Sequence, residues 1–355
     1  MEEFKRKLAS IRKIAEVLPI EGADNIELVK VDGWQCVTKK GEFTVGELCV
    51  YFEINSFLPI KPEFEFLRKS SYKKMGGKEG FRLKTIRLRG QLSQGLVLKR
   101  IDVFSLRELY SMPPNDEGAD GYADNDLKEG ADVTEELEVI RYEPPIPACL
   151  VGKVKGNFPS FIRKTDQERV QNIWNKIKDS KESFEVTVKL DGTSCTYYLK
   201  DGVFGVCSRN LELIETEGNT LWKIAREIKV EEVLREYGNN IALQGEVTGE
   251  GIQGNPLGTK GQMFSLFDIW DIDNQCYYKA PERTLFGFFK LNERHVPVIY
   301  PSLTLENFNC LDDLLIFANG PEGRPREGLV FKSNDSGLTF KVISNEYLLK
   351  NKEYL

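Results

Sequence analysis

The feature that most constrains this chain is an alternating stretch that ends in a lysine followed by an Asp-Gly pair. It runs Phe184-Glu-Val-Thr-Val-Lys189-Leu-Asp191-Gly192. Alternation of apolar and polar residues predicts a half-buried β-strand, and Asp-Gly predicts a tight turn directly after it. We therefore expect the amine of Lys189 to be held at the end of a strand, beside that turn.

The same Lys-x-Asp-Gly pattern also occurs at Lys30-Val-Asp32-Gly33, so the tetrapeptide alone is weak evidence. The two copies differ in their downstream residues. The intervals after Lys30 hold Val50 and Arg87 where an arginine and a glutamate are needed. Because Lys30–Gly33 lies between two apolar alternations, we interpret it as a hairpin turn. The intervals after Lys189 hold an ordered set of polar and aromatic residues: Arg209, Glu246, Phe267, Asp268, Glu327, Gly328 and Lys341.

This ordered set indicates nucleotidyl transfer. A lysine nucleophile must lose its proton, and neighbouring cations, a metal ion or burial lower its pKa. We expect Lys341 and a divalent ion to act on Lys189, which would attack the α-phosphate of ATP, expel pyrophosphate and hold AMP as a phosphoramidate. The other roles that we assign are ribose and phosphate binding by Asp191 and Arg209, ribose or metal binding by Glu246, stacking on the purine by Phe267, binding of a metal-bound water by Glu327, and neutralisation of the α-phosphate charge by Lys341.

Each of these residues also has a purely structural interpretation, which the sequence leaves open. Arg209 is a surface cation in that view, and Phe267 is a core residue of an apolar run. Glu246 and Glu327 are then hairpin residues beside glycines. The order of the set downstream of one lysine favours the catalytic interpretation.

Composition limits the remaining classes of function. The chain has 355 residues, 41% hydrophobic and 29% charged, which is enough for two domains. Its seven cysteines lack Cys-x-x-Cys spacing and its one histidine, His295, lies in an apolar neighbourhood, which disfavours disulfide frameworks, zinc sites and histidine catalysis. The N-terminus lacks the apolar core of a signal peptide and no apolar run could span a membrane, so we expect a cytoplasmic protein without membrane contact.

The first part of the chain predicts a small β-barrel. Short strands alternate with turn signals over residues 8–100, and 81–90 alternate apolar and basic residues, with a change of phase at Thr85-Ile86 that predicts a bulge or a barrel corner. Although the net charge is −6, this region gathers cations around Tyr72 and Phe81, a mixture suited to phosphate contact and base stacking. A solvated strand face is the alternative. The cations are Lys73, Lys74, Lys78, Arg82, Lys84, Arg87, Arg89, Lys99 and Arg100.

The second part of the chain predicts a mixed domain of helices and largely antiparallel sheets. Residues 102–143 are acidic and rich in Gly, Asp and Pro, which predicts a linker. A helix is expected to begin at the N-cap residue Thr165, which Glu168 follows three positions on, and another at Thr220. The expected fold class is α+β, with an oligonucleotide-binding (OB) barrel in 1–101, the linker in 102–143 and the nucleotidyltransferase domain in 144–355.

With these motifs the chain resembles the covalent nucleotidyltransferase superfamily and, within it, the ATP-dependent RNA ligases. The resemblance covers about residues 144–355. It implies Lys189 as the adenylated nucleophile, Glu246 and Glu327 as metal ligands, and Mg²⁺ or Mn²⁺ as cofactor beside ATP. Further nucleotide-binding residues that it implies are Asp191, Gly192, Arg209, Asn210, Glu246, Phe267, Glu327 and Lys341, with Arg169 of the Phe158–Asn172 segment as a phosphate contact.

The sequence departs from this family in its last motif. Many relatives have two lysines separated by one residue, whereas Thr339-Phe-Lys341-Val-Ile343 has one. Lys332 and Lys350 are the substitutes that we consider for the second charge. Only fourteen residues follow Lys341, whereas DNA ligases and capping enzymes carry a further barrel there, so ATP is expected as the donor rather than GTP.

The barrel in front of this domain, with Glu21-Gly-Ala-Asp-Asn-Ile and Arg89-Gly-Gln-Leu-Ser-Gln-Gly-Leu96, looks like that of the RNA ligases typified by Deinococcus and Naegleria enzymes. The resemblance implies joining of 3′-hydroxyl and 5′-phosphate RNA ends, in nicked duplexes or broken strands, and a role in RNA repair, with no obligate protein partner. Two alternatives stay open: another covalent nucleotidyltransferase, such as a DNA ligase or guanylyltransferase, and a catalytically inactive RNA-binding protein.

Overall fold

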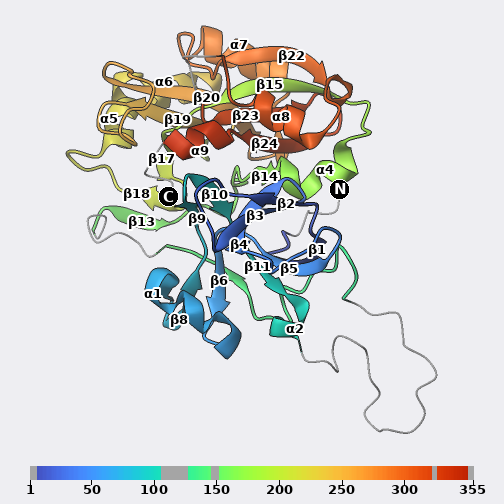
Figure 1. The fold of residues 1–355 in the computed structure, drawn as a ribbon. Coiled ribbons are helices and arrows are strands. Elements are labelled where there is room, and N and C mark those ends of the chain that lie inside the picture. Colours follow the sequence, from blue (N-terminus) through green and yellow to red (C-terminus); the bar gives the residue numbers. More distant parts are fainter. Residues whose placement is uncertain (1–5, 105–126, 145–151, 322–325, 351–355) are drawn as a thin grey trace, which may run out of the picture. The chain divides into compact units, whose positions relative to one another are not determined.

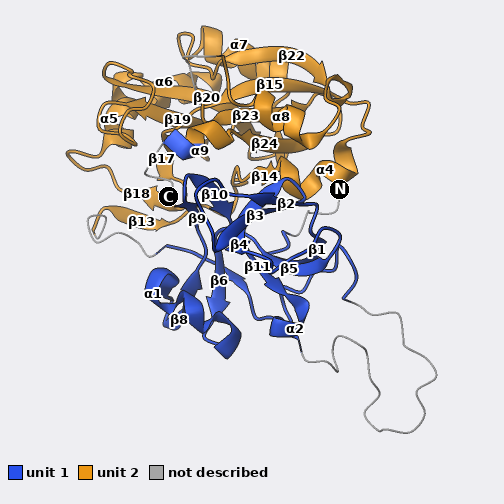
Figure 2. Ribbon diagram, viewed as in Figure 1, with its two compact units in different colours: residues 1–145, 348–355 blue, residues 146–347 orange. Residues whose placement is uncertain are grey.

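The computed structural model describes residues 6–104, 127–144, 152–321 and 326–350. The chain divides into two compact units, residues 1–145 with 348–355, and residues 146–347 (Figure 2). Figure 1 labels the elements of each unit. In the parts of the chain that are described, no helix has the length and the apolar character needed to span a membrane.

The first unit is built from short antiparallel strands in an OB-type domain (Figure 1). Its described sheets are separate and are not hydrogen-bonded into a closed barrel, so the expected strands are present but the expected closure is not. Three short helical segments, η1 (Pro62–Leu67), α1 (Arg68–Ser71) and α2 (Arg100–Val103), join the strands. The sheets, in hydrogen-bonded order, are β1 (Ala9–Lys13), β5 (Leu48–Phe52) and β11 (Leu96–Lys99); β2 (Glu16–Pro19), β3 (Ile26–Val31) and β4 (Trp34–Lys39); β10 (Gln91–Gln94) and β9 (Thr85–Leu88); and β12 (Ile140–Arg141), β6 (Ser56–Pro59), β8 (Lys78–Arg82) and β7 (Tyr72–Met75).

The first Lys-x-Asp-Gly copy is a hairpin turn, as predicted. Val31 of β3 pairs with Trp34 of β4, which leaves Asp32 and Gly33 as a two-residue loop. Both have positive φ, 46° and 77°, the conformation of the turn that matches the twist of a hairpin. Lys30 Nζ bonds Glu16 Oε1 on the neighbouring strand at 3.2 Å. This lysine therefore belongs to the sheet.

The basic segment is two strands rather than one bulged strand. β8 pairs with β6 and β7, whereas β9 pairs with β10 in another sheet. The change of phase, for which a bulge or a corner was expected, is therefore the point at which the chain passes from one sheet to another. Phe81 on β8 is completely buried, so it is not available for base stacking, which corrects that expectation.

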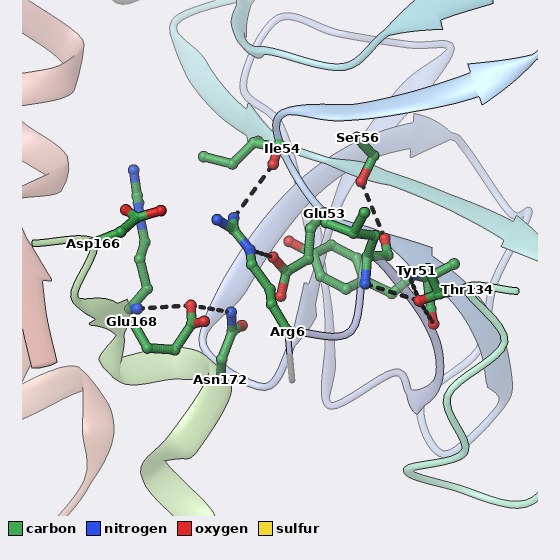
Figure 3. A network of polar contacts seen from close by, with 12 residues as sticks. Arg6, Tyr51, Glu53, Ile54, Ser56, Thr134, Asp166, Glu168 and Asn172 are labelled. Atoms are coloured by element: carbon green, nitrogen blue, oxygen red, sulfur yellow. Dashed lines mark hydrogen bonds and ion pairs between the residues drawn. The ribbon is translucent and has the colours of Figure 1, made fainter. Parts of the chain in front are cut away.

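The described end of the predicted linker is part of the first unit. Val133, Leu137 and Val139 are buried in its hydrophobic core, and β12 pairs with β6. Thr134 Oγ1 accepts hydrogen bonds from two backbone N–H groups at the start of β1, at 3.0 and 3.1 Å (Figure 3). The acidic composition of this segment predicted a linker, although three of its apolar residues are buried in the core. The unit boundary observed at 145/146 thus differs from the expected division at 101 and 143.

The second unit contains two larger sheets (Figure 1). The described helices are α4 (Val170–Ile177), α5 (Thr220–Glu227), α6 (Val230–Tyr237), α7 (Ala280–Phe289), η3 (Leu305–Asn307), α8 (Leu311–Phe317) and the first half of α9 (Asn345–Lys350), whose residues from Leu348 on belong to the first unit. The first sheet has the order β13 (Val154–Asn157), β18 (Leu211–Leu213), β17 (Val203–Ser208), β16 (Thr193–Lys200), β19 (Ile241–Gly249), β20 (Gln262–Asp271) and β21 (Cys276–Tyr277). The second has the order β14 (Glu168–Arg169), β24 (Thr339–Ile343), β23 (Gly328–Ser333), β15 (Ser183–Lys189) and β22 (Val298–Thr304).

The first predicted helix of this unit begins later than expected. Glu168 and Arg169 form the short strand β14, which pairs in parallel with Phe340 and Lys341 of β24, so α4 begins only at Val170. Pairing with the sheet overrides the capping signal at Thr165. Glu168 Oε1 accepts from Arg169 N at 2.9 Å and from Asn172 Nδ2 at 2.7 Å, which fixes the strand-to-helix corner (Figure 3). The helix predicted from Thr220 is confirmed as α5, with Asn219 as its N-cap.

A buried ionic cluster joins the two sheets of the second unit. Arg283 of α7 pairs with Glu185 of β15 and lies 3.7 Å from Asp268 of β20, and Lys332 of β23 lies 2.7 Å from Asp268. These four side chains are at most 8% exposed. His295 Nε2 accepts from Arg283 Nε at 3.3 Å, and burial lowers the pKa of His295. Buried charges are costly without partners, so the cluster ties the sheets together as a unit.

Replacing Arg283 with methionine should destabilise the second unit strongly. The variant leaves Glu185 and Asp268 buried with less compensating charge, and loss of one partner of a buried ion pair costs about 3 kcal/mol or more. Urea unfolding measures the effect. Lys290→Met is the control, because Lys290 pairs with Glu236 at an exposed position and should cost less than about 1 kcal/mol. Equal losses for the two variants would show that the cluster contributes no more than a surface pair.

Candidate active site

The site is centred on Lys189 at the end of β15. Antiparallel pairing places Lys189 opposite Gly328 of β23, so Glu327, one residue before that strand, lies beside the lysine. Lys189 Nζ is 2.5 Å from Glu327 Oε1 and 2.6 Å from Oε2. The lysine side chain is 27% exposed and the glutamate 9%. The amine is therefore reachable from solvent while its carboxylate partner is buried.

The turn after Lys189 packs closely against β19. A Cβ on Gly192 would lie 2.3 Å from the carbonyl oxygen of Val247 and 3.0 Å from Cγ of Glu246, so no larger residue fits without movement of the backbone. Asp191, 6% exposed, accepts a hydrogen bond from the hydroxyl of Tyr347 at 2.5 Å. The Asp-Gly pair therefore provides both a close approach to β19 and a buried carboxylate.

Glu246 and Glu327 form a destabilised acidic pair. Burial raises the pKa of Glu246 to about 7; the positive charge of Lys189 opposes this rise, and the negative charges of Glu327 and Asp191 add to it. Burial also raises the pKa of Glu327, again opposed by Lys189. Carboxylates in this state gain from a nearby cation. Within the described ranges, no group of three or more His, Cys, Asp or Glu residues forms a metal site, so metal binding by this pair remains a proposal.

Positive charges also gather near Lys189. Lys341 of β24 lies beside Arg169 of β14 in the parallel register, and Asp166 lies 3.7 Å from Lys341 Nζ and 3.2 Å from Arg209. Burial lowers the pKa of Lys341 to about 8; Asp166 opposes this effect, while Lys189 and the two arginines add to it. Lys341 and Arg209 lie next to one carboxylate and Arg169 lies near Lys341, so the region has a positive potential suited to phosphate groups. Sequence reasoning assigned no role to Asp166, although it lies in the Phe158–Asn172 segment.

Phe267 lies at an irregularity of β20, where the pairing with β19 shifts between Gln244 and Gly245. Lys332 donates to the carbonyl of Phe267 and to Asp268 Oδ1, and its Nζ lies 5.7 Å from the ring centroid. Burial lowers the pKa of Lys332 to about 8. Phe267 is partly exposed rather than a core residue. Lys332 is thus engaged in holding Phe267 and Asp268.

Asn210 is the predicted residue that the structure places away from the buried groups. It is exposed in the turn between β17 and β18, where its carbonyl accepts from Phe158 N at 2.8 Å and its side chain accepts from Lys164 at 3.3 Å. Arg209 beside it is 62% exposed and reaches the site through Asp166. The polar cluster of the site therefore combines residues of β14, β15, β19 and β24 with Arg209, directly after β17, and Glu327, directly before β23.

Comparisons with known proteins agree with this arrangement. Residues 182–343 match the family described as RNA ligase, and residues 8–100 match an OB-fold domain. Solved structures of Naegleria gruberi RNA ligase are similar along the chain. A mutant with AMP and Mn is 45% identical (TM-score 0.78), covering 98% of this chain and 100% of that chain. A mutant with ATP and Mn is 46% identical (0.78), and the ligase with PPi is 46% identical (0.76), with the same coverages. No curated protein matches.

Replacing Glu246 with glutamine should stabilise the ligand-free protein at high pH only. The pKa of Glu246 rises from 4.5 in the unfolded chain to about 7, so the folded state retains a proton in this window that the unfolded state releases. Stability of the wild type therefore falls as pH rises through the window. One pKa unit is worth about 1.4 kcal/mol, so the variant should gain at most about 3 kcal/mol above pH 7.

Urea unfolding at about pH 4 and about pH 8, without nucleotide or metal, measures this difference. The advantage of Glu246→Gln should be small at the lower pH and largest at the higher one. An equal advantage at both values would show that the variant acts through packing rather than through the charge of Glu246.

Proposed function

The chain belongs to the RNA ligase family, and we propose that it seals RNA strands with ATP through an AMP bound covalently to Lys189. The single observation that carries this proposal is the position of Lys189, whose Nζ lies within 2.6 Å of both carboxylate oxygens of Glu327. This contact holds the amine at the end of β15 in a position from which it can attack a phosphate once it has lost its proton.

In the first step the neutral amine of Lys189 attacks the α-phosphorus of ATP. A nitrogen–phosphorus bond forms, the bond from the α-phosphorus to the oxygen that bridges it to the β-phosphate breaks, and pyrophosphate leaves with that electron pair, while the nitrogen gives up a proton to solvent. Lys341, Arg169 and Arg209 bind the negative charge of the transferring phosphate. Phe267 provides an aromatic face for the purine.

The acidic pair fits a divalent cation. Glu246 and Glu327 are carboxylates whose pKa values are raised by burial, a condition that a bound Mg²⁺ or Mn²⁺ relieves. Such an ion supplies positive charge to phosphate oxygens. Glu327 also affects the protonation of Lys189, because its contact with the amine stabilises the ammonium form. When Glu327 binds the divalent cation instead, the amine is released from that ion pair.

Two further transfers complete sealing. The 5′-phosphate of RNA attacks the phosphorus of lysyl-AMP, which frees Lys189 and gives an AMP-capped 5′ end. The 3′-hydroxyl then attacks the 5′-phosphate and AMP leaves, so one phosphodiester forms for each ATP cleaved to AMP and pyrophosphate. This sequence suits repair of nicked duplexes or broken RNA ends.

Lys189→Ala should abolish transfer of AMP to the protein, whereas Lys30→Ala should not. The second variant is the matched control, since Lys30 has the same Lys-x-Asp-Gly neighbourhood but lies in a hairpin strand beside Glu16. The assay is incubation with ATP labelled at the α-phosphate and Mg²⁺ or Mn²⁺, followed by a denaturing gel. Label lost from Lys30→Ala and kept by Lys189→Ala would contradict the proposal.

The first unit supports the proposal with a basic surface. Lys73 and Lys74 of β7, Lys78 of β8, and Lys84 are exposed. Lys74 pairs with Glu79 at 2.7 Å, while Arg82 stacks over the ring of Tyr142 at 4.3 Å. Because phosphate contacts supply most non-specific nucleic-acid affinity, we propose that Lys73, Lys78 and Lys84 bind the RNA backbone.

The combined variant Lys73→Ala/Lys78→Ala should bind nicked duplex RNA more weakly without losing adenylation of Lys189. The slope of log affinity against log salt should fall by roughly one for each phosphate that the variant no longer binds. Titration of labelled nicked RNA at several salt concentrations measures this. Lys39→Ala/Lys40→Ala is the control, with two exposed cations removed from another part of the same unit. Equal weakening by both pairs would argue for net charge rather than a defined surface.

A further inference from the structure

The hydroxyl of Tyr347 reaches back to the active-site turn. Tyr347 Oη donates to Asp191 Oδ2 at 2.5 Å, although the two residues are 156 positions apart in the chain. Tyr347 is 5% exposed and Asp191 6%. Both residues belong to the second unit, which ends at Tyr347. A hydroxyl that donates to an ionised carboxylate away from water forms one of the stronger hydrogen bonds in proteins.

The turn that carries Tyr347 is itself attached to Glu327. Ser344, completely buried between β24 and α9, donates its backbone N–H to the carbonyl of Glu327 at 2.9 Å. Its hydroxyl donates to Asn319 at 2.8 Å and accepts from the backbone N–H of Tyr347 at 3.0 Å. One short segment thus contacts the backbone of the residue that pairs with Lys189 and the side chain two residues after Lys189.

The charge of Asp191 acts on both acidic residues of the site. It contributes to the raised pKa of Glu246 and of Glu327. A rotation of the Asp191 carboxylate therefore changes the field at the two carboxylates that surround the nucleophile. Because such fields depend steeply on distance at buried positions, the orientation of Asp191 bears on the reaction.

We propose that Tyr347 is a positioning residue for transfer of AMP to Lys189. Its hydroxyl holds the Asp191 carboxylate in one orientation. Ser344, which bonds the backbone of both Tyr347 and Glu327, fixes the position of Tyr347 relative to Glu327. The role rests on the proposed function of Lys189. It extends the active site beyond Lys341 to a residue that no sequence motif marks, and Tyr347 acts through Asp191 rather than on the nucleotide.

Tyr347→Phe tests this inference, because it removes the hydroxyl and keeps the ring. We expect the single-turnover rate of adenylation at saturating ATP to fall about tenfold or more, with little change in the ATP concentration at half-maximal rate. Tyr197→Phe is the matched control. The buried hydroxyl of Tyr197 donates to the carbonyl of Leu221 at 3.1 Å, within a hydrophobic core cluster of the second unit. It should lower the urea midpoint similarly and leave the rate unchanged.

A double-variant comparison separates positioning from folding. If Tyr347 acts through Asp191, Asp191→Asn/Tyr347→Phe should be no slower than Asp191→Asn alone. Independent losses that multiply, or a rate of Tyr347→Phe equal to that of Tyr197→Phe, would overturn the inference. If wild type forms no AMP adduct, the proposed function itself fails. If wild type forms the adduct and Tyr347→Phe matches it, only the role of Tyr347 fails.

Discussion

The pairing of β15 with β23 is the constraint on which the rest of the site depends. It brings Lys189 and Glu327 together across 138 positions of sequence. Neighbouring strands lie about 4.8 Å apart in the hydrogen-bonding direction, so a fixed register determines which side chains can touch. A slip by one residue would turn Lys189 to the other face. The buried cluster of Glu185, Arg283, Asp268 and Lys332 crosses between the sheets and supports that arrangement.

The site gathers acidic and basic side chains around one amine. The acidic ones are Asp191, Glu246 and Glu327, and the basic ones are Arg169, Arg209 and Lys341. Burial raises the pKa of the two glutamates and lowers that of Lys341, so contact with an opposite charge stabilises each of them. Such a site is arranged for a ligand that carries both signs, as a nucleotide with its metal ion does. The arrangement thus favours ligand binding over the stability of the empty protein.

Local patterns identified the features that depend on few neighbours. The Asp32-Gly33 turn follows from the conformational needs of a two-residue hairpin, and the start of α5 follows from Asn219 and helical spacing. Features that depend on distant partners were missed. The start of α4 was misplaced because Glu168 and Arg169 pair with β24, which no local window reveals.

The same distinction between local patterns and distant contacts decides which site residues could be predicted from the sequence. Residues with a motif around them could be named from the sequence, and the structure brings Lys189, Asp191, Glu246, Glu327 and Lys341 together. Asp166 lies in the Phe158–Asn172 segment, but no local pattern reveals its contacts with Lys341 and Arg209, and Tyr347 lies outside the motifs. The apolar anchors in residues 127–144 were concealed by the acidic composition around them.

The central claim is that one amine, that of Lys189, becomes covalently attached to AMP. Its most direct test is peptide mapping by mass spectrometry after incubation of the intact protein with ATP and Mn²⁺. We predict the added mass of AMP on the peptide that contains Lys189, with fragment ions that locate it on this lysine, and its loss when pyrophosphate is added back. An AMP adduct on any other residue, or no adduct in folded protein shown to be free of AMP at the start, would contradict the account.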